Sequence, residues 1–226
     1  MAYFRCSSSN GGAAEPTFST TTLYDSDGDY SSVASMTLSE DYHDFDFLKF
    51  TIYKDISSTP TYAGEFIISP TAIDEIYTNR GLYINFFPLF NPSNYGLCIS
   101  PSDNTTFARR WYREVSISKI EGLNCTNKSV TASVLYSASA SVTSYTLSDD
   151  VRDYDYLTVQ ALGSVDEVGF SLMRMDNIFK DDEVIIHAPT YMCNSRATAM
   201  AGSIDGINFY KYYGNGIAVV VGYKFT

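Results

Sequence analysis

The segment Thr37-Leu-Ser-Glu-Asp-Tyr-His-Asp-Phe-Asp-Phe-Leu48 returns later in the chain as Thr146-Leu-Ser-Asp-Asp-Val-Arg-Asp-Tyr-Asp-Tyr-Leu157. Seven of the twelve positions are identical, and three more exchange Glu for Asp or Phe for Tyr. Internal similarity of this kind indicates that one structural unit occurs twice. We call the two segments the acidic repeat.

Both copies of the acidic repeat have similar surroundings. A Leu-Tyr pair at Leu23 or Leu135 precedes each copy, and a β-like run that reaches Gly122 or Gly222 closes each module. The chain therefore divides into an N-terminal segment with a Ser- and Gly-rich tether (residues 1–19), a first module (20–123), a polar linker (124–129) and a second module (130–226).

The residues around and after each acidic repeat alternate in character. In the first module Leu48, Phe50 and Ile52 share one side, and Phe47, Lys49, Thr51 and Tyr53 share the other. In the second module Leu157, Val159 and Ala161 likewise oppose Tyr156, Thr158 and Gln160. Successive side chains of a strand point to opposite faces, so this spacing predicts a strand with one face in a core.

Helical signals are scarce in the rest of the chain. Residues 70–78 predict one short helix, because Ile73, Ile76 and Tyr77 share a face. The remaining short apolar runs are separated by Gly, Asn, Asp and Ser, and Gly214-Asn-Gly216 predicts a hairpin turn. We expect an all-β fold of two tandem β-sandwich, jelly-roll-like domains.

The composition excludes several classes of protein. Hydrophobic residues make up 45% of the 226 residues and charged residues 18%, which is too apolar for a disordered chain. No run approaches the roughly 18 consecutive apolar residues of a membrane-spanning helix. The net charge of −11 repels phosphate backbones. We therefore expect neither nucleic-acid binding nor membrane insertion.

The cysteines and the N-terminus indicate the cellular compartment in which the chain folds. Cys6, Cys98, Cys125 and Cys193 are far apart and form no C-x-x-C pair, so we expect free thiols rather than a zinc or redox site. The first residues lack the basic and apolar regions of a secretory signal, which predicts folding in a reducing cytoplasm. The glycosylation sequons at Asn104, Asn124 and Asn127 are then chance matches.

The carboxylates of the acidic repeat suggest two hypotheses, a catalytic site and a metal-binding site. The conserved set within the two copies is Ser39, Asp41, Asp44 and Asp46 with Ser148, Asp150, Asp153 and Asp155. We favour a structural role, with Ser39 and Ser148 as N-caps of a helical turn and Asp46 and Asp155 bonded to a neighbouring turn. A glycosidase needs only two suitably separated carboxylates, so that alternative stays open.

Other candidate sites are weaker. Asp25-Ser-Asp-Gly-Asp29 resembles the start of a calcium loop, but Tyr30 and Met36 stand where an EF-hand needs Gly and Glu, so an exposed turn is favoured. His43 and His187 lack the spacing of a metal or triad site and are expected to be surface or strand residues. We predict no catalytic residue, no metal and no cofactor.

The densest positive charge surrounds the single tryptophan. Arg109-Arg-Trp-Tyr-Arg113 is matched in the second module by Phe209-Tyr-Lys-Tyr-Tyr213. Trp, Tyr and Arg dominate binding hot spots, so the candidate ligand-binding residues are Arg110, Trp111, Tyr112, Arg113, Tyr210 and Tyr212. The alternative is an edge strand whose arginines discourage aggregation or pair with acidic neighbours.

The chain resembles a module of tailed-bacteriophage virion proteins in its acidic repeat, its Leu-Tyr pair and the closing Gly222-Tyr-Lys. Such modules occur in tail-fibre, baseplate and head-fibre proteins, mostly from phages and prophages of gut bacteria. The resemblance implies a non-enzymatic β-sandwich appendage that is commonly trimeric and exposed to the host surface. Residues 1–14 would be its attachment segment. The first module departs from the pattern at Leu123-Asn-Cys.

We therefore expect a structural protein of a phage virion, a fibre or decoration subunit made in the host cytoplasm. It would form a homotrimer, contact other virion proteins through its N-terminal segment and touch host-surface carbohydrate. One alternative is a tail-associated glycan-degrading enzyme that uses a carboxylate pair. Another is a stand-alone carbohydrate-binding module that binds sugar through Trp111.

Overall fold

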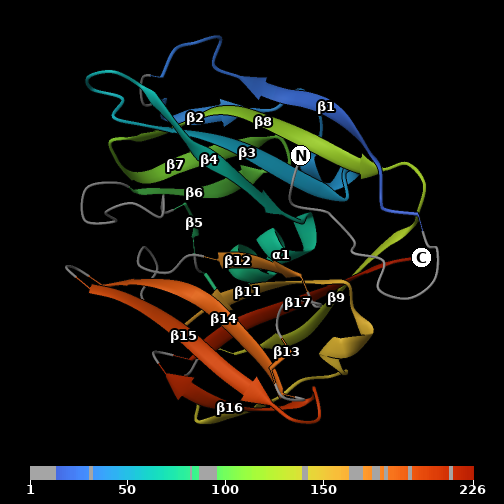
Figure 1. The fold of residues 1–226 in the computed structure, drawn as a ribbon. Coiled ribbons are helices and arrows are strands. Elements are labelled where there is room, and N and C mark those ends of the chain that lie inside the picture. Colours follow the sequence, from blue (N-terminus) through green and yellow to red (C-terminus); the bar gives the residue numbers. More distant parts are fainter. Residues whose placement is uncertain are drawn as a thin grey trace.

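The fold is seen in a computed structural model. It describes residues 14–30, 33–81, 83–86, 96–138, 142–162, 170–174, 179–180, 183–192, 195–213 and 216–226. The described part of the chain is mostly β, as predicted, and its strands form four antiparallel sheets (Figure 1).

The first two sheets use the N-terminal part of the chain. Their strands are β1 (Phe18–Asp25), β2 (Ser35–Thr37), β3 (Phe47–Lys54), β4 (Thr61–Ile68), β5 (Ile84–Phe86), β6 (Gly96–Asp103), β7 (Thr106–Arg113) and β8 (Val115–Cys125). Sheet A has the order β1-β8-β3-β4 and sheet B the order β2-β7-β6-β5. Since β8 runs to Cys125, the first two residues of the expected linker lie in a strand.

The other two sheets use residues 130–225. Their strands are β9 (Val130–Ser137), β10 (Ser144–Thr146), β11 (Tyr156–Ala161), β12 (Phe170–Arg174), β13 (Phe179–Lys180), β14 (Glu183–Met192), β15 (Ser195–Ser203), β16 (Asn208–Tyr213) and β17 (Ile217–Phe225). Sheet C has the order β9-β17-β11-β12 and sheet D the order β10-β16-β15-β14-β13. Sheet C therefore repeats the strand order of sheet A, and sheet D repeats that of sheet B with β13 added.

Each pair of sheets packs face to face around apolar side chains. In the first module the strand pairs β1–β8 and β2–β7 are those of a jelly roll. The middle strands differ, because β3 and β4 form a hairpin within sheet A and β5, β6 and β7 form a meander within sheet B. The middle strands thus do not alternate between the sheets.

Short helical elements connect the strands. The acidic repeats form the 3₁₀ turns η1 (Tyr42–Asp44) and η3 (Val151–Asp153). The predicted helix begins at Pro70 as α1 (Pro70–Asp74) and continues as the π-helical turn η2 (Glu75–Asn79). The Ser69 hydroxyl caps α1 by accepting a hydrogen bond from the Ala72 amide. Ile73 and Ile76 are fully buried, which confirms the apolar face.

A glycine in the closing strand of each module lies beneath an aromatic ring. A methyl group on Gly122 would come within 2.3 Å of Phe45 Cδ1, and one on Gly222 would come within 2.5 Å of Tyr154 Cδ1. Phe45 and Tyr154 occupy the same position of the acidic repeat. The repeat and the closing glycine thus form one packing unit that occurs twice.

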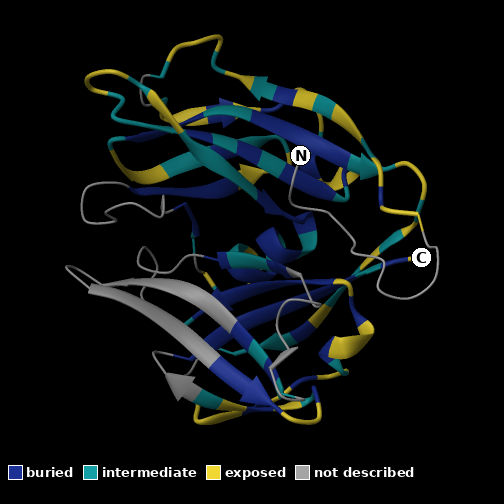
Figure 2. Cartoon of the chain, viewed as in Figure 1, coloured by how far each residue is buried: buried dark blue, intermediate teal, exposed yellow. Residues whose placement is uncertain are grey.

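The two modules share a continuous hydrophobic core. Phe47 of β3 packs against Tyr223 and Phe225 of β17, with ring centroids 5.1 and 6.1 Å apart. Phe170 of β12 packs against Phe86 of β5 at 6.0 Å. Sheet C lies between these contacts and sheet D, and its central strands β11 and β17 are buried over almost their whole length (Figure 2).

Burial of sheet C on both sides corrects one prediction. Leu157, Val159 and Ala161 of β11 face the core of the second module, as expected. The opposite side is also buried: Tyr156 joins the core shared with the first module, and Thr158 and Gln160 are fully buried. In β3, by contrast, Lys49, Thr51 and Tyr53 remain partly exposed. The same alternating pattern occurs in β3 and β11, because the pattern does not show whether another part of the chain packs on the second face of the strand.

Residues 214 and 215 of the predicted hairpin turn lie outside the described part, but the strands on either side do not pair as a hairpin. The strand before it, β16, belongs to sheet D, and the strand after it, β17, belongs to sheet C. The connection therefore passes from one sheet to the other, and Gly216 has a φ of 100°, which a glycine adopts without strain.

Candidate functional site

The acidic repeats form capped turns, but the capping residue differs from the prediction. Asp41 is the N-cap of η1 and accepts a hydrogen bond from the His43 amide at 2.9 Å. Asp150 is the N-cap of η3 and accepts from the Arg152 amide at 2.9 Å. The sequence prediction placed the cap at Ser, two residues too early, because Ser and Asp are both favoured N-caps.

Ser39 and Ser148 instead join the turn to the first strand of each module. The Ser39 amide donates to the Leu23 carbonyl at 2.9 Å, and the Ser148 amide donates to the Leu135 carbonyl at 2.9 Å. Their hydroxyls donate weakly to the preceding carbonyls of Thr22 and Val134. The Leu-Tyr pair and the acidic repeat are therefore in contact.

The last Asp of each repeat binds the closing strand. Asp46 Oδ2 accepts from the Cys125 amide at 2.8 Å, and Asp155 Oδ2 accepts from the Phe225 amide at 2.8 Å. The Asp46 amide in turn donates to the Leu123 carbonyl. Each carboxylate thus satisfies a backbone donor at the end of β8 or β17, which is a strand end and not the neighbouring turn that was predicted.

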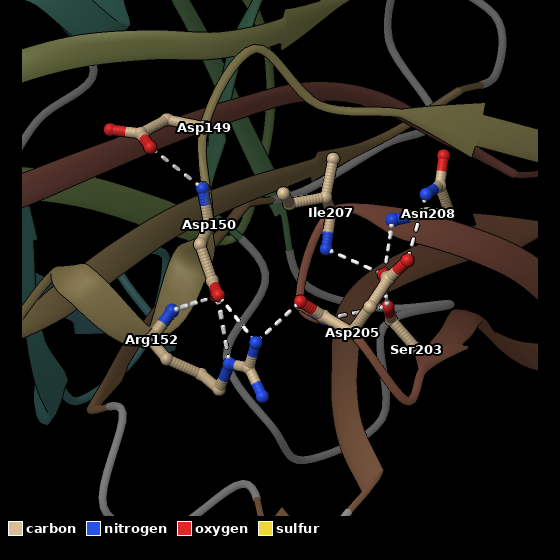
Figure 3. Close-up of polar contacts among 8 residues, drawn as sticks. Asp149, Asp150, Arg152, Ser203, Asp205, Ile207 and Asn208 are labelled. Carbon is tan, nitrogen blue, oxygen red and sulfur yellow. Dashed lines mark hydrogen bonds and ion pairs between the residues drawn. The ribbon is translucent and has the colours of Figure 1, made fainter.

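The cap of the second module carries an ion pair, shown in Figure 3. The Arg152 guanidinium donates to both oxygens of Asp150 and, at 2.6 Å, to the Asp205 carbonyl. These hydrogen bonds from Arg152 hold the pKa of Asp150 below its usual value. Hydrogen bonds from Asn208 and Ile207 hold the pKa of Asp205 well below its usual value.

In the first module His43 takes the position of Arg152. Its Nδ1 lies 2.8 Å from Asp41 Oδ1, and its Nε2 lies 3.0 Å from Asp74 Oδ2 in α1. Tyr42 donates its hydroxyl to Asp74 Oδ1 at 2.8 Å. His43 is exposed, as predicted, but its two carboxylate partners were not predicted. Asp74 is 31 residues away, and sequence spacing cannot show such a contact.

Two further acids that both copies share lie on the surface. Asp44 and Asp153 are exposed residues of the two 3₁₀ turns. The possible calcium loop is an exposed turn in which Asp25 accepts from the Asp27 amide at 2.9 Å. Among the residues that the structure describes, no cluster of three or more His, Cys, Asp or Glu could hold a metal ion.

The predicted ligand-binding residues of the first module lie on β7. Trp111 is 37% exposed and Tyr112 is 40% exposed, and Arg113 is also exposed. Arg110 Nε donates to the Ser100 hydroxyl of β6 at 2.6 Å. The Arg109 guanidinium lies 4.2 Å from the centre of the Tyr112 ring. We call residues 109–113 the β7 surface; it presents aromatic rings beside fixed positive charge.

The second module places its aromatic residues on β16, the equivalent strand of sheet D. Tyr210 is 40% exposed, and its hydroxyl donates to Glu183. The side chain of Tyr212 lies outside the described residues. In Figure 1 β7 is in the upper module and β16 at the bottom of the molecule, so the two strands form separate surfaces and not one shared site.

A charged cluster on the outer face of sheet A was not predicted. Lys49 Nζ contacts Glu121 Oε2 at 2.6 Å and Glu65 Oε1 at 3.6 Å, and Lys119 also contacts Glu121. Burial opposes the charge on Glu121, but the two lysines outweigh it and lower its pKa. These residues are neighbours only through strand register, as with Lys49 opposite Glu121, so no local motif reveals them.

A groove with a volume of about 270 Å³ lies beside the first capped turn. His43, Asp46 and Asp74 line one part, while Val130 and Ala132 of β9 line another. The acids here are already bonded to His43, Tyr42 or the Cys125 amide.

The remaining predictions concern cysteine, histidine and membranes. Cys125 is a free thiol and Cys98 is buried, whereas Cys6 and Cys193 lie outside the described residues. His187 belongs to β14, and its side chain is also outside the described part. In the described part of the chain no helix has the length and apolar character needed to cross a membrane.

Comparisons with known proteins do not assign the chain to a family. Searches against protein-family models and against curated proteins find no match.

Proposed function

We propose that the chain is a non-enzymatic structural subunit of a tailed-bacteriophage virion, a fibre or decoration protein that exposes the β7 surface for contact with host carbohydrate. The observation that carries the proposal is the use of the acidic repeat. Asp41 and Asp150 cap equivalent turns, and Asp46 and Asp155 bind equivalent backbone amides. The carboxylates make the same hydrogen bonds in both modules. This supports a role in stabilising the fold and not in acid-base catalysis.

The β7 surface supports the contact role. Trp111 and Tyr112 offer half-exposed rings of the kind that stack on sugars, and Arg110 is held in place by Ser100. Arginine and tyrosine are also common in protein interfaces, and a trimer of the chain would use such a surface as well.

The first experiment measures the mass of the purified full chain by light scattering. A trimer of about 75 kDa, three times 25.1 kDa, supports a virion appendage. A monomer of about 25 kDa contradicts the fibre form of the proposal and favours a sugar-binding module.

The second experiment tests carbohydrate contact with the labelled chain on an array of bacterial surface glycans. We expect Trp111→Ala to reduce binding at least tenfold. The control is Tyr62→Ala, which removes an aromatic ring that is 54% exposed on β4, outside the β7 surface. Equal binding by the wild type and the Trp111 variant would contradict a role for the β7 surface in carbohydrate contact.

A further inference from the structure

His43 lies between two carboxylates in a geometry that fixes its protonation state. Nδ1 faces Asp41 Oδ1 at 2.8 Å, and Nε2 faces Asp74 Oδ2 at 3.0 Å. An ionised carboxylate only accepts hydrogen bonds, and a neutral imidazole donates from only one nitrogen. Both contacts are hydrogen bonds at once only when both ring nitrogens carry protons. The geometry therefore selects the imidazolium cation.

The charged groups beside the ring are acidic. Asp41 on its own turn and Asp74 on α1 are the charged groups in contact with His43, and Asp46 lines the same groove. The Tyr42 ring stacks on the imidazole at 4.0 Å, and β9 presents only Val130 and Ala132 to the groove.

Burial and hydrogen bonding shift the pKa of His43 in opposite directions. Partial burial lowers the pKa of His43, but the hydrogen bonds to Asp41 and Asp74 outweigh it and raise the pKa above 6.5. The Asp41 pKa is held below its usual value by the His43 amide and side chain, so this carboxylate stays ionised in mild acid.

The contact joins the acidic repeat to a helical segment that also meets the second module. Asp74 is the last residue of α1, and the next residue, Glu75, accepts a hydrogen bond from the Ser137 hydroxyl of β9. At the start of α1, the Ser69 hydroxyl lies 2.9 Å from the Tyr223 hydroxyl of β17. His43 therefore ties the acidic repeat to the helical segment packed at the module junction.

The second module supplies an internal comparison. Arg152 occupies the position of His43 and makes the corresponding contact with its N-cap, Asp150. An arginine stays charged at all accessible pH values, whereas a histidine loses its charge near neutrality. The same turn thus exists in a permanently charged form and in a titratable form.

We propose that His43, Asp41 and Asp74 form a pH-dependent latch that fastens α1 to the acidic repeat of the first module. The folded state holds the proton more tightly than the unfolded chain, so the latch contributes fully below pH 6.5. Its contribution is lost as the pH rises through the raised pKa of His43. Release loosens the α1 segment at the module junction.

The test uses nuclear magnetic resonance on the full chain, which contains only two histidines. His187→Gln assigns the two ring signals. We expect His43 to titrate above pH 6.5 in the wild type and its midpoint to fall in Asp74→Asn, with its binding constant for the proton changing tenfold per unit of pKa. A wild-type midpoint at or below 6.5, or an unchanged midpoint in Asp74→Asn, overturns the proposal.

Hydrogen exchange tests release of the helix. We expect protection factors of residues 70–79 to fall between pH 6 and pH 8.5 in the wild type, by up to tenfold for each unit by which the pKa is raised. His43→Arg, which copies the second module, is expected to abolish this pH dependence. Identical pH dependence in both proteins overturns the latch. If a variant fails to fold, the wild-type midpoint alone decides.

Discussion

Individual carboxylates in this protein act mainly as acceptors for backbone amides. Asp155 illustrates this at the end of the chain, where its Oδ2 accepts from the Phe225 amide at 2.8 Å. Its neighbour in the repeat, Asp153, is exposed and has no such role. Identity between two copies of a motif therefore indicates a shared requirement of the fold at some positions, while at others the side chain only faces water.

The first prediction separates these two acids. Asp155→Ala leaves the Phe225 amide without its acceptor and should lower the free energy of unfolding by about 1–2 kcal/mol. Asp153→Ala is the control and should change it by less than about 0.5 kcal/mol. Urea denaturation of both variants measures the difference, and equal values for the two would contradict the assigned role.

A second prediction concerns acid stability. The pKa of Asp205 is held low by hydrogen bonds from Asn208 and the Ile207 amide, so its stabilising effect is present above the unfolded value of 3.8. That contribution is lost as the pH falls through the folded pKa. Melting temperatures between pH 2 and pH 5 should therefore fall more steeply for the wild type than for Asp205→Asn. Parallel curves would rule out this carboxylate as a source of acid sensitivity.

At the scale of the element, each module closes by placing an aromatic ring of the acidic repeat on a glycine of the last strand. Tyr154 lies on Gly222 in this way, and Phe45 lies on Gly122. The ring and the strand approach so closely that any side chain at the glycine displaces the ring.

A third prediction follows for this contact. Gly222→Ala forces the Tyr154 ring aside and should destabilise the protein by about 1–3 kcal/mol, the usual range for overpacking. Tyr154→Ala removes the ring, so adding Gly222→Ala to that variant should have little further effect. A double-mutant cycle by thermal unfolding measures the coupling, and strictly additive effects would contradict the packing described.

The sequence predicts elements better than it predicts their partners. The alternation at Leu157, Val159 and Ala161 correctly places one face of β11 in a core. It does not show that sheet C is covered on its other face, because burial there depends on residues such as Phe47 in the other module. The β7 surface is visible in the sequence for the opposite reason: an uninterrupted local run of Arg, Trp and Tyr carries it.

At the scale of the whole molecule, the two modules are joined through buried aromatic rings. Phe47 is fully buried between Phe18, Tyr223 and Phe225. Burial raises the pKa of Tyr223 to about 12, and its hydroxyl is bonded to Ser69 and Thr158. A junction of this kind favours coupled unfolding of the two modules.

A fourth prediction tests this coupling. Phe47→Ala should destabilise the chain by about 3–5 kcal/mol and separate the melting of the two modules in calorimetry. Trp111→Ala, at an exposed position of β7, should leave one transition with an almost unchanged midpoint. A single unchanged transition for Phe47→Ala would contradict a shared core.

We propose that the duplicated carboxylates build the fold and take no part in catalysis. The most direct measurement compares Asp46→Asn with Asp155→Asn for thermal stability and for release of reducing ends from bacterial surface polysaccharides. We predict that the melting temperatures of both variants fall by a similar amount. We also predict that the wild type releases no reducing ends from the polysaccharides. Hydrolysis by the wild type that one substitution abolishes, with its melting temperature unchanged, would contradict the claim.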